Sequence, residues 1–399
     1  MALAESIYFQ NGLVRRAALR AFWPLFFVRL VTDVQLSPLQ LVLLGTVMEL
    51  SILFAEVPTG IIADLYSRKW SVIIAFLVGG PAIIASAFVD NYVALIVVQS
   101  IIGVAATFES GAETAWISDE LGSAESAEPL ILRRAQWEHG AAVAGIAVFA
   151  GLAGITTLST SLAVVGGFYF VYGLTLVSRM PETAFVPDEH GGWSGFANMM
   201  QRGWRVSSGA RPLRILLLVI LLSGLAKEAI DRLDVQRLVD VGLPESADDA
   251  VVIGAIVAAR SAFAAVALWV ARQRGAGPGV VRAMSLLFTG VAVGVAVLAQ
   301  VPVLIIAAIG LVVQGGLHLA TVPLTVTWTN NFAPPDARAT VHSFIGQAEA
   351  FGEILGGIAL GVVAEVITVP TAMTISAVLF AGAAIVSLTA RSTWTSQDL

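Results

Sequence analysis

Residues 57–70 read VPTGIIADLYSRKW and mark a point where an apolar run meets a charged turn. The apolar run continues through Gly60 to Ala63, and Asp64, Arg68 and Lys69 follow directly. Charged side chains are costly in hydrocarbon, so such a cluster is expected where a helix leaves a membrane. A carboxylate there can accept hydrogen bonds from the open N–H groups at the start of another helix, and the cations can pair with nearby acids. Contacts of this kind can latch one conformation.

The composition on either side of this stretch is that of a membrane protein. Of 399 residues, 57% are hydrophobic and only 13% are charged, against about a quarter in a typical soluble domain. The net charge of −6 and the lack of a basic tract exclude nucleic acid as a partner. Without cysteine, the chain has no disulfide, thiolate nucleophile or cysteine-ligated metal site.

Apolar blocks long enough to cross a bilayer, at about 20 residues each, recur along the whole chain. The fold class predicted from them is an all-α polytopic membrane protein with twelve transmembrane helices in two pseudo-symmetric six-helix bundles. The blocks cover residues 6–32, 38–63, 70–89, 92–118, 131–154, 160–178, 212–238, 250–271, 280–299, 302–328, 339–365 and 370–390.

Basic residues set the predicted orientation. Alternate connections between the blocks hold fourteen Lys and Arg, whereas the other connections hold none, which places both termini in the cytoplasm. The residue at which the first membrane helix begins is not decided by the sequence. It contains Arg15 and Arg16, so it could be a cytoplasmic amphipathic segment, with the membrane entered at Ala17.

The longest polar stretch divides the chain into three predicted parts: an N-terminal bundle at 1–178, a cytoplasmic linker at 179–211 and a C-terminal bundle at 212–399. In the linker, Phe196, Met200 and Trp204 recur every fourth residue, as in a helix lying on the inner membrane surface; a plain solvated linker is the alternative. The pattern Q-x-E-x6-G occurs at both 136–145 and 347–356, at equivalent places in the two bundles, which indicates a duplicated six-helix unit.

The stretch at 57–70 resembles the loop after the second helix in the major facilitator superfamily, which carries G-x-x-x-D-x-x-G-R-R/K. Gly60, Asp64, Arg68 and Lys69 match, and Ser67 stands where the family usually has Gly. The resemblance implies a gating role, in which Asp64 approaches the start of the eleventh helix when the cytoplasmic side is closed. Other signatures depart from the family's drug–proton antiporters, since the arginine position of the fourth helix is Gln99 and residues 140–145 lack the proline of the fifth-helix kink.

Ionised groups inside the blocks need water, a partner or a proton. The resemblance implies that the first, fourth, seventh and tenth helices line a central cavity. A carboxylate beside an arginine there can exchange its proton for a substrate or for that salt bridge. The proton-coupling candidates are Glu113, Asp231 and Glu109, and Glu109 and Glu113 are predicted to share one helix face. The cavity or substrate candidates are Arg20, Arg29, Gln99, Glu228, Arg232, Gln314 and His318. Permanent structural ion pairs are the alternative.

These features predict a secondary active transporter that works by alternating access, with proton-coupled efflux of a small amphipathic molecule preferred. Uptake or facilitated transport of a polar or anionic metabolite stays open, because arginines suit carboxylates and phosphates. A non-transporting receptor or an intramembrane enzyme is a remote alternative, since no H-E-x-x-H, G-x-S-x-G or phosphate-loop motif occurs.

The expected partners are a small-molecule substrate, protons and the lipid bilayer. We expect no enzyme activity, no cofactor and no metal, because the histidines lie on separate blocks without metal-ligand spacing. The chain is expected to function as a monomer in the inner or plasma membrane.

Overall fold

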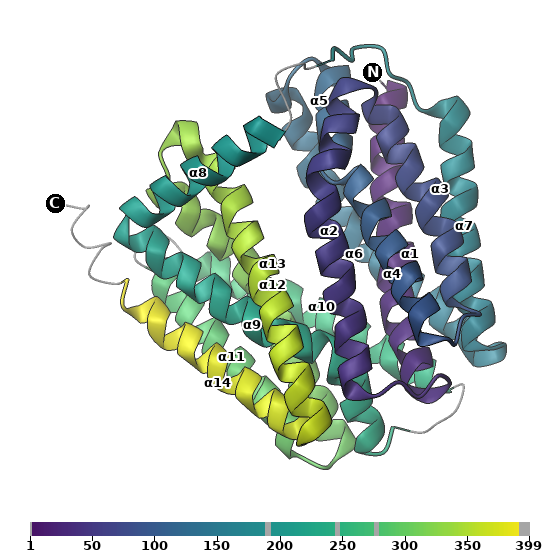
Figure 1. Ribbon diagram of the computed structural model, residues 1–399, viewed down its shortest axis with the longest axis vertical. Coiled ribbons are helices and arrows are strands. Elements are labelled where there is room, and N and C mark those ends of the chain that lie inside the picture. The colour runs from purple at the N-terminus through teal and green to yellow at the C-terminus, as the bar shows by residue number, and fades with distance from the viewer. Residues whose placement is uncertain (1, 188–192, 244–247, 275–278, 391–399) are drawn as a thin grey trace. The chain divides into compact units, whose positions relative to one another are not determined.

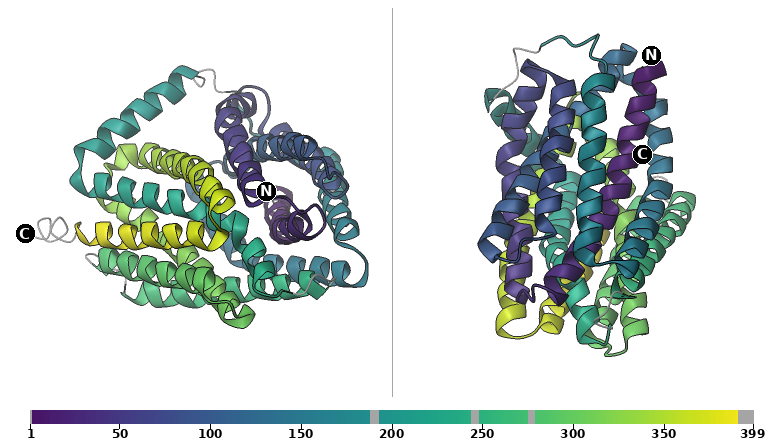
Figure 2. Two further views of the ribbon diagram at one scale, coloured as in Figure 1. Left: turned by 60° about the horizontal axis from the view of Figure 1, so that its bottom comes forward. Right: turned by 90° about the vertical axis from the view of Figure 1, so that its right-hand side faces the viewer.

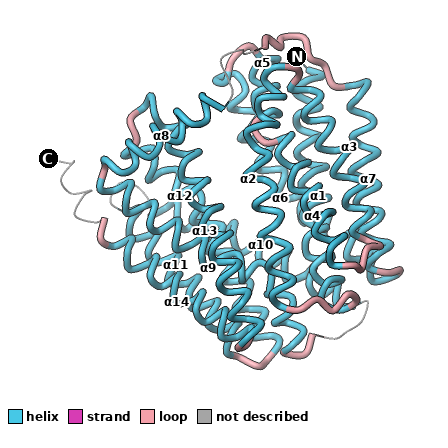
Figure 3. The backbone as a smooth tube through the Cα atoms, in the orientation of Figure 1, coloured by secondary structure: helices cyan, strands magenta, loops and turns pink. Residues whose placement is uncertain are grey.

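The computed structural model describes residues 2–187, 193–243, 248–274 and 279–390. Within these ranges the chain is built from α-helices and one 3-10 turn at Pro335–Ala337, and no β-strand occurs (Figure 3). The predicted all-helical class is therefore confirmed.

The first part of the chain forms seven helices, joined by short turns (Figure 1). Polar side chains that accept a backbone N–H begin several of them: Asn91 before α4, Ser123 before α6 and Thr157 before α7. The helices are α1 (Ala2–Thr32), α2 (Pro38–Leu65), α3 (Arg68–Ser86), α4 (Tyr92–Glu109), α5 (Ala112–Leu121), α6 (Ala124–Ile155) and α7 (Leu158–Arg179).

The second part of the chain forms seven more helices. Thr368 caps the last of them through a bond from the N–H of Thr371. The helices are α8 (Trp193–Gly209), α9 (Arg211–Asp240), α10 (Asp248–Arg274), α11 (Gly279–Gln300), α12 (Leu304–Phe332), α13 (Arg338–Val366) and α14 (Val369–Leu388).

Each predicted apolar block coincides with a long helix, except that the fourth block contains two. The helix is interrupted at Ser110 and Gly111, where Gly111 takes a φ of 76°, a conformation that favours glycine. The prediction that Glu109 and Glu113 share the face of one continuous helix is wrong, because the break lies between them.

Nine helical segments of the described chain, α4 and α5 counted as one, are long and apolar enough to cross a membrane. Among the helices that coincide with predicted apolar blocks, α1, α9 and α13 fall short, and each carries at least four charged residues. The number of twelve crossings stays a prediction.

Backbone contacts divide the chain into two compact units. Unit 1 holds residues 1–35, 47–195 and 245–255. In it α1 packs along α6, and α3 packs along α7 and α4. The crossing of α1 and α6 is very close, since a Cβ at Gly145 would lie 2.2 Å from the Ala17 carbonyl oxygen.

Unit 2 holds residues 36–46, 196–244 and 256–399. Here α9 packs along α13 and α14, and α11 packs along α12 and α14, so that α9, α14 and α11 run side by side (Figure 2). A Cβ at Gly356 would lie 2.1 Å from the Leu225 carbonyl oxygen, where α13 crosses α9. Gly145 and Gly356 are the glycines of the two Q-x-E-x6-G repeats, so the repeated pattern marks the same kind of crossing in both units.

Helix α8 occupies much of the predicted linker. Its residues from 196 onward belong to unit 2, where Gly203 and Trp204 contact Phe344 near the start of α13. Trp204 is 62% exposed. The division into 1–178, 179–211 and 212–399 and the membrane-surface role of this helix stay predictions.

Candidate functional site

Five charged side chains of unit 1 alternate in sign along one connected path, which we call the charge ladder: Glu109, Arg15, Glu138, Arg134 and Glu113. Glu109 pairs with Arg15, whose Nη2 lies 3.8 Å from Glu138 Oε1. Arg134 Nε lies 3.1 Å from the same Glu138 oxygen. At the far end, Arg134 Nη1 lies 2.7 Å from Glu113 Oε2. The ladder joins α4, α1, α6 and α5.

The charge ladder is buried and held from further sides. Its three glutamates and Arg134 are each at most 8% exposed. Arg16 adds a third cation on Glu138, with Nη2 2.8 Å from Oε2. The ring of Tyr8 lies 3.8 Å from the Arg134 guanidinium carbon, and the Tyr8 carbonyl accepts from Arg134 Nη1 at 3.2 Å. Buried charges are costly unless they are paired, and each member of the ladder has at least one partner of opposite sign.

Glu113 is the incompletely satisfied member of the charge ladder. Its Oε2 accepts from Arg134, whereas Oε1 is buried and has no hydrogen-bond partner among the described residues. The hydrogen-bonding capacity of such a free oxygen can be met in two ways. The oxygen can take a proton, or it can accept a hydrogen bond from a molecule that enters beside it. Glu109 and Glu113 therefore end the ladder on opposite sides of the Gly111 break.

Unit 2 contains a second buried charge group, the Lys227 cluster: Lys227, Asp231, Arg260 and Glu353. Lys227 Nζ lies 2.6 Å from Glu353 Oε1 on α13 and 3.6 Å from Asp231 Oδ2 on its own helix, α9. Arg260 Nη2 on α10 lies 3.7 Å from Asp231 Oδ1. The side chain of Arg260 lies over Gly315 of α12, where a Cβ would meet its Nε at 1.9 Å. Arg260 is thus the more loosely bound cation of the two.

A separate ion pair joins Glu228 and Arg232, with Nε 2.7 Å from Oε1. A Cβ at Gly45 would lie 2.1 Å from Arg232 Nε, and one at Gly357 would lie 3.0 Å from the Glu228 Cγ. The two glycines therefore allow α2 and α13 to close over the pair. Both side chains are less than a tenth exposed, as in an enclosed ion pair.

The predicted gating loop lies at the junction of α2 and α3. Arg68 pairs with Asp119 of α5, donates to the Ala115 carbonyl at 3.3 Å and lies 3.4 Å from Asp64 Oδ1. Asp64 keeps 45% of its side chain exposed. A Cβ at Gly60 would meet nothing within 4 Å. Arg68 thus links two acids at one end of unit 1.

Ser67, the departure from the family pattern, has a local structural reason. It is the N-cap of α3 and accepts from the Trp70 N–H at 3.0 Å, which glycine could not do. Glu182, just after α7, accepts from Ser67 Oγ at 2.6 Å and from the Lys69 backbone N–H at 2.8 Å. Next to it, Glu120 accepts from the Thr183 hydroxyl at 2.8 Å. The segment after α7 is therefore fastened to α3 and α5.

No protein-family model and no curated protein matches the chain. Among solved structures, the nucleoside transporter NupG gives a TM-score of 0.75 at 16% identity, over 99% of each chain. A bacterial homologue of the human lysosomal transporter Spinster, in an inward-facing and unoccupied conformation, gives 0.72 at 14% identity over 99% of this chain and 97% of that one. A POT family transporter in complex with 5-aminolevulinic acid gives 0.73 at 9% identity over 98% of this chain and 96% of that one.

The chain has the major facilitator fold. The prediction of this fold from residues 57–70 and the helix layout is therefore confirmed. At identities this low the likeness establishes the fold and leaves the individual site residues as predictions.

Within this major facilitator fold, Arg29 lies far from the charge ladder. It follows Arg16 by 13 residues, about 20 Å along α1. Arg29 pairs with Asp90 and donates to the Val89 carbonyl at 3.1 Å and to Ser159 Oγ at 3.2 Å. These contacts join the end of α1 to the segment after α3 and to the start of α7, and the cavity role of Arg29 stays a prediction. Arg20 lies on α1 one turn after Arg16.

The tenth-helix candidates lie on α12. His318 is buried, with Nε2 3.1 Å from Ser223 Oγ, and its ring contacts Phe288 and Phe380. Gln314 is 1% exposed, and its Oε1 has no partner among the described residues. In unit 1 the amide nitrogen of Gln99 is also buried and has no hydrogen-bond partner among the described residues. Within the described residues no group of three His, Asp or Glu is placed to hold a metal ion.

Sequence reasoning missed Arg134, Glu138 and Glu353 as charge partners. A signal for Glu138 was present, since it is the glutamate of the first Q-x-E-x6-G pattern. For Arg134 the signal was its position four residues before Glu138, which places both side chains on one face of α6. For Glu353 the signal was its place inside the apolar block at 339–365, which it interrupts.

Proposed function

We propose that the chain is a secondary active transporter that works by alternating access and couples substrate movement to protons. The fold it shares with the transporters named above supports the class. The observation that supports the coupling is Glu113, a buried carboxyl group with one oxygen on Arg134 and the other without a partner within the ranges that the structure describes. Such a group can exist as a paired carboxylate or as an acid, and the two forms differ by one charge inside unit 1.

In this mechanism a proton is added to Glu113 Oε1, and the ion pair with Arg134 weakens. Arg134 keeps its second acid, Glu138, so the guanidinium remains compensated while the pair rearranges. Loss of the proton on the other side of the membrane restores the pair. Asp231, between Lys227 and Arg260, is the matching candidate in unit 2, and Glu109 is the third.

Efflux of a small amphipathic molecule is the activity we propose first, with the multi-pass chain in the inner or plasma membrane and both termini in the cytoplasm. One observation favours the second candidate, transport of a polar or anionic metabolite. Arg260 Nε is buried without a hydrogen-bond partner among the described residues, and the carboxylate that its Nη2 approaches, Asp231, is 3.7 Å away. A guanidinium held this loosely suits a carboxylate or phosphate.

The test uses purified protein in liposomes that contain a pH-sensitive dye. Amphipathic cations and organic anions are added in turn, and a substrate is recognised by a proton flux that depends on the protein. Glu113→Gln should abolish the substrate-driven proton flux while retaining substrate exchange at equilibrium. Glu128→Gln, an exposed change on α6, should retain both the proton flux and the exchange. Wild-type proton flux in Glu113→Gln would refute the coupling role.

Substrate class follows from the same assay. If the protein transports anionic metabolites, Arg260→Gln should abolish transport of organic anions. If it exports amphipathic molecules, the same variant should transport an amphipathic cation as the wild type does.

A further inference from the structure

A groove of about 530 Å³ runs between α10 and α11 in unit 2. Val270 and Gly279 lie at one end, near the facing ends of the two helices, and Phe263 and Leu317 lie at the other. The rest of the lining is apolar except for one residue, Arg282. From Gly279 to Leu287 the groove follows α11 for about 12 Å.

Side chains at the edge of this groove are exposed although they are apolar. Val266 on α10 is 58% exposed, and Leu286 on α11 is 69% exposed. In a helix of a membrane protein, such side chains are expected to face hydrocarbon. An apolar occupant of the groove would therefore come from the bilayer.

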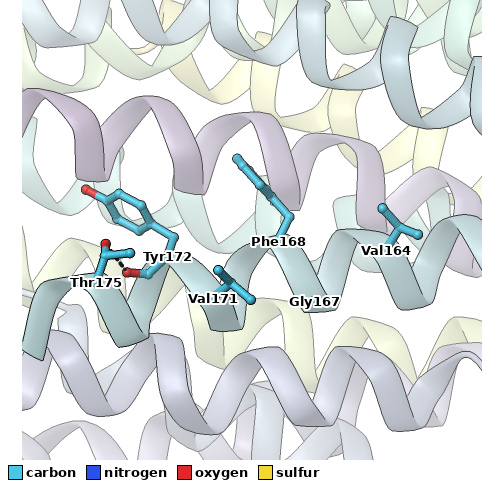
Figure 4. Close-up of a pocket in the computed structure, with 6 residues that line it drawn as sticks. All are labelled: Val164, Gly167, Phe168, Val171, Tyr172 and Thr175. Carbon is cyan, nitrogen blue, oxygen red and sulfur yellow. Dashed lines mark hydrogen bonds between the residues drawn. The ribbon is translucent and has the colours of Figure 1, made fainter.

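Two other grooves of similar volume have no charged lining. One, of about 510 Å³, lies along α7 and is lined by Val164, Phe168 and Tyr172 among others (Figure 4). The other, of about 520 Å³, lies between α11 and α14 and includes Thr289 and Thr374. The groove between α10 and α11 differs from both because Arg282 lines it. A charged side chain beside an apolar groove suits an amphipathic molecule with a charged group, whereas the other two grooves have the character of a general lipid-facing surface.

Arg282 lies in the first turn of α11, which begins at Gly279 and contains no acidic residue. The N–H groups of a first turn have no partner within their own helix, and they favour an anion together with a nearby cation. Arg272 and Arg274 belong to the same connection in the sequence, which the distribution of basic residues places on the cytoplasmic side. Anionic lipids attract basic residues at that surface.

We infer that this groove binds one acyl chain of an anionic phospholipid, whose phosphate pairs with Arg282 at the first turn of α11. The inner end of the groove is Phe263, which packs against Gly316 of α12, where a Cβ would lie 2.6 Å from the ring. Phe263 lies about one turn after Arg260, so a bound chain supports the α10 segment that carries this cation.

The experiment measures binding of phosphatidylglycerol and of phosphatidylcholine to the detergent-purified protein by native mass spectrometry. We expect the wild type to prefer phosphatidylglycerol. Arg282→Gln should weaken phosphatidylglycerol binding by about tenfold and leave phosphatidylcholine binding unchanged. Arg214→Gln, an exposed arginine at the start of α9, should change neither.

The groove itself is tested by Ala283→Phe, which fills it and should weaken binding of both lipids. Ala283→Leu gives a smaller insertion in case the larger one prevents folding, which melting in phosphatidylcholine reveals. Phosphatidylglycerol binding that survives either folded Ala283 variant would refute the groove. Competition by inorganic phosphate as effective as that by phosphatidylglycerol would show a free-anion site in place of a lipid site, and would also refute the inference.

Discussion

Arg134 holds Glu113 by a single oxygen, with Nη1 2.7 Å from Oε2, and the second oxygen of that carboxyl group is buried with no partner in the described part of the chain. The same guanidinium also contacts Glu138 through Nε at 3.1 Å. One arginine therefore joins an acid that has a free oxygen to an acid that shares three cations. This shared position makes Arg134 the side chain through which the state of Glu113 reaches the rest of the charge ladder.

Arg134→Gln should be strongly destabilising, because it removes the cation that pairs with the buried Glu113. Breaking one side of a buried pair typically costs about 3–5 kcal/mol. Thermal unfolding in detergent measures the loss. The double change Arg134→Gln with Glu113→Gln removes both charges and should recover part of it. If the double variant is no more stable than the single one, the two side chains do not act as a pair.

Asp64→Asn should favour conformations that are open to the cytoplasm, if the gating role inferred from the resemblance is correct. The chain has no cysteine, so Gln314→Cys gives a single labelling site. In inside-out vesicles, a membrane-impermeant maleimide should react several times faster when Asp64→Asn is added. Asp33→Asn, beyond the end of α1, serves as the control. Equal labelling rates in all three backgrounds would remove the gating role of Asp64.

Arg29 and Arg237 should be equivalent clamps, one in each unit. Arg237, near the end of α9, donates from Nε to the Leu298 carbonyl at 3.0 Å, as Arg29 donates to the Val89 carbonyl at the end of α3. Hydrogen bonds from charged donors contribute about 1.5–3 kcal/mol. Arg29→Gln and Arg237→Gln should each lower the unfolding free energy by that amount while keeping the ratio of protons to substrate. A changed ratio in Arg29→Gln would instead assign this residue to coupling.

Gly145→Ala and Gly356→Ala should each disrupt a helix crossing, since the added Cβ would lie 2.2 Å and 2.1 Å from a backbone oxygen of the facing helix. Each unit offers a matched control on the same helix. Gly140 and Gly346 have nothing within 4 Å of an added Cβ, and alanine there should stabilise the helix by up to about 1 kcal/mol. Melting temperatures should therefore fall for the first pair and stay or rise for the second. The same response in all four variants would show that the close crossings do not limit stability.

Hydropathy along the chain predicts the long helices well, because a membrane-spanning helix is selected for continuous apolar length. It cannot detect the break at Gly111, since Tyr92–Leu121 still has the length and average hydropathy of a single membrane span. One glycine among the many of this chain gives no signal until its φ is known.

The sequence identifies which charges are buried better than it identifies their partners. Glu109 and Glu113 were recognised because they interrupt an apolar block, but their partners, Arg15 and Arg134, come from α1 and α6. Such pairings depend on how helices distant in the sequence are placed. For Arg237 there was a usable signal. Arg29-Leu30-Val31 recurs as Arg237-Leu238-Val239, and each run is followed by a residue with positive φ, Gln35 at 56° and Gly242 at 100°.

The fastening of the segment after α7 has a practical consequence for engineering. Glu182 and Thr183 are tied to Ser67 and Glu120, so a polypeptide that ends before them would leave the first turn of α3 without its acidic partner. A split version of the protein, expressed as two separately translated fragments, should therefore be divided after Ala184 and before Trp193. A fragment ending at Arg179 would lack the residues that complete its own folded edge.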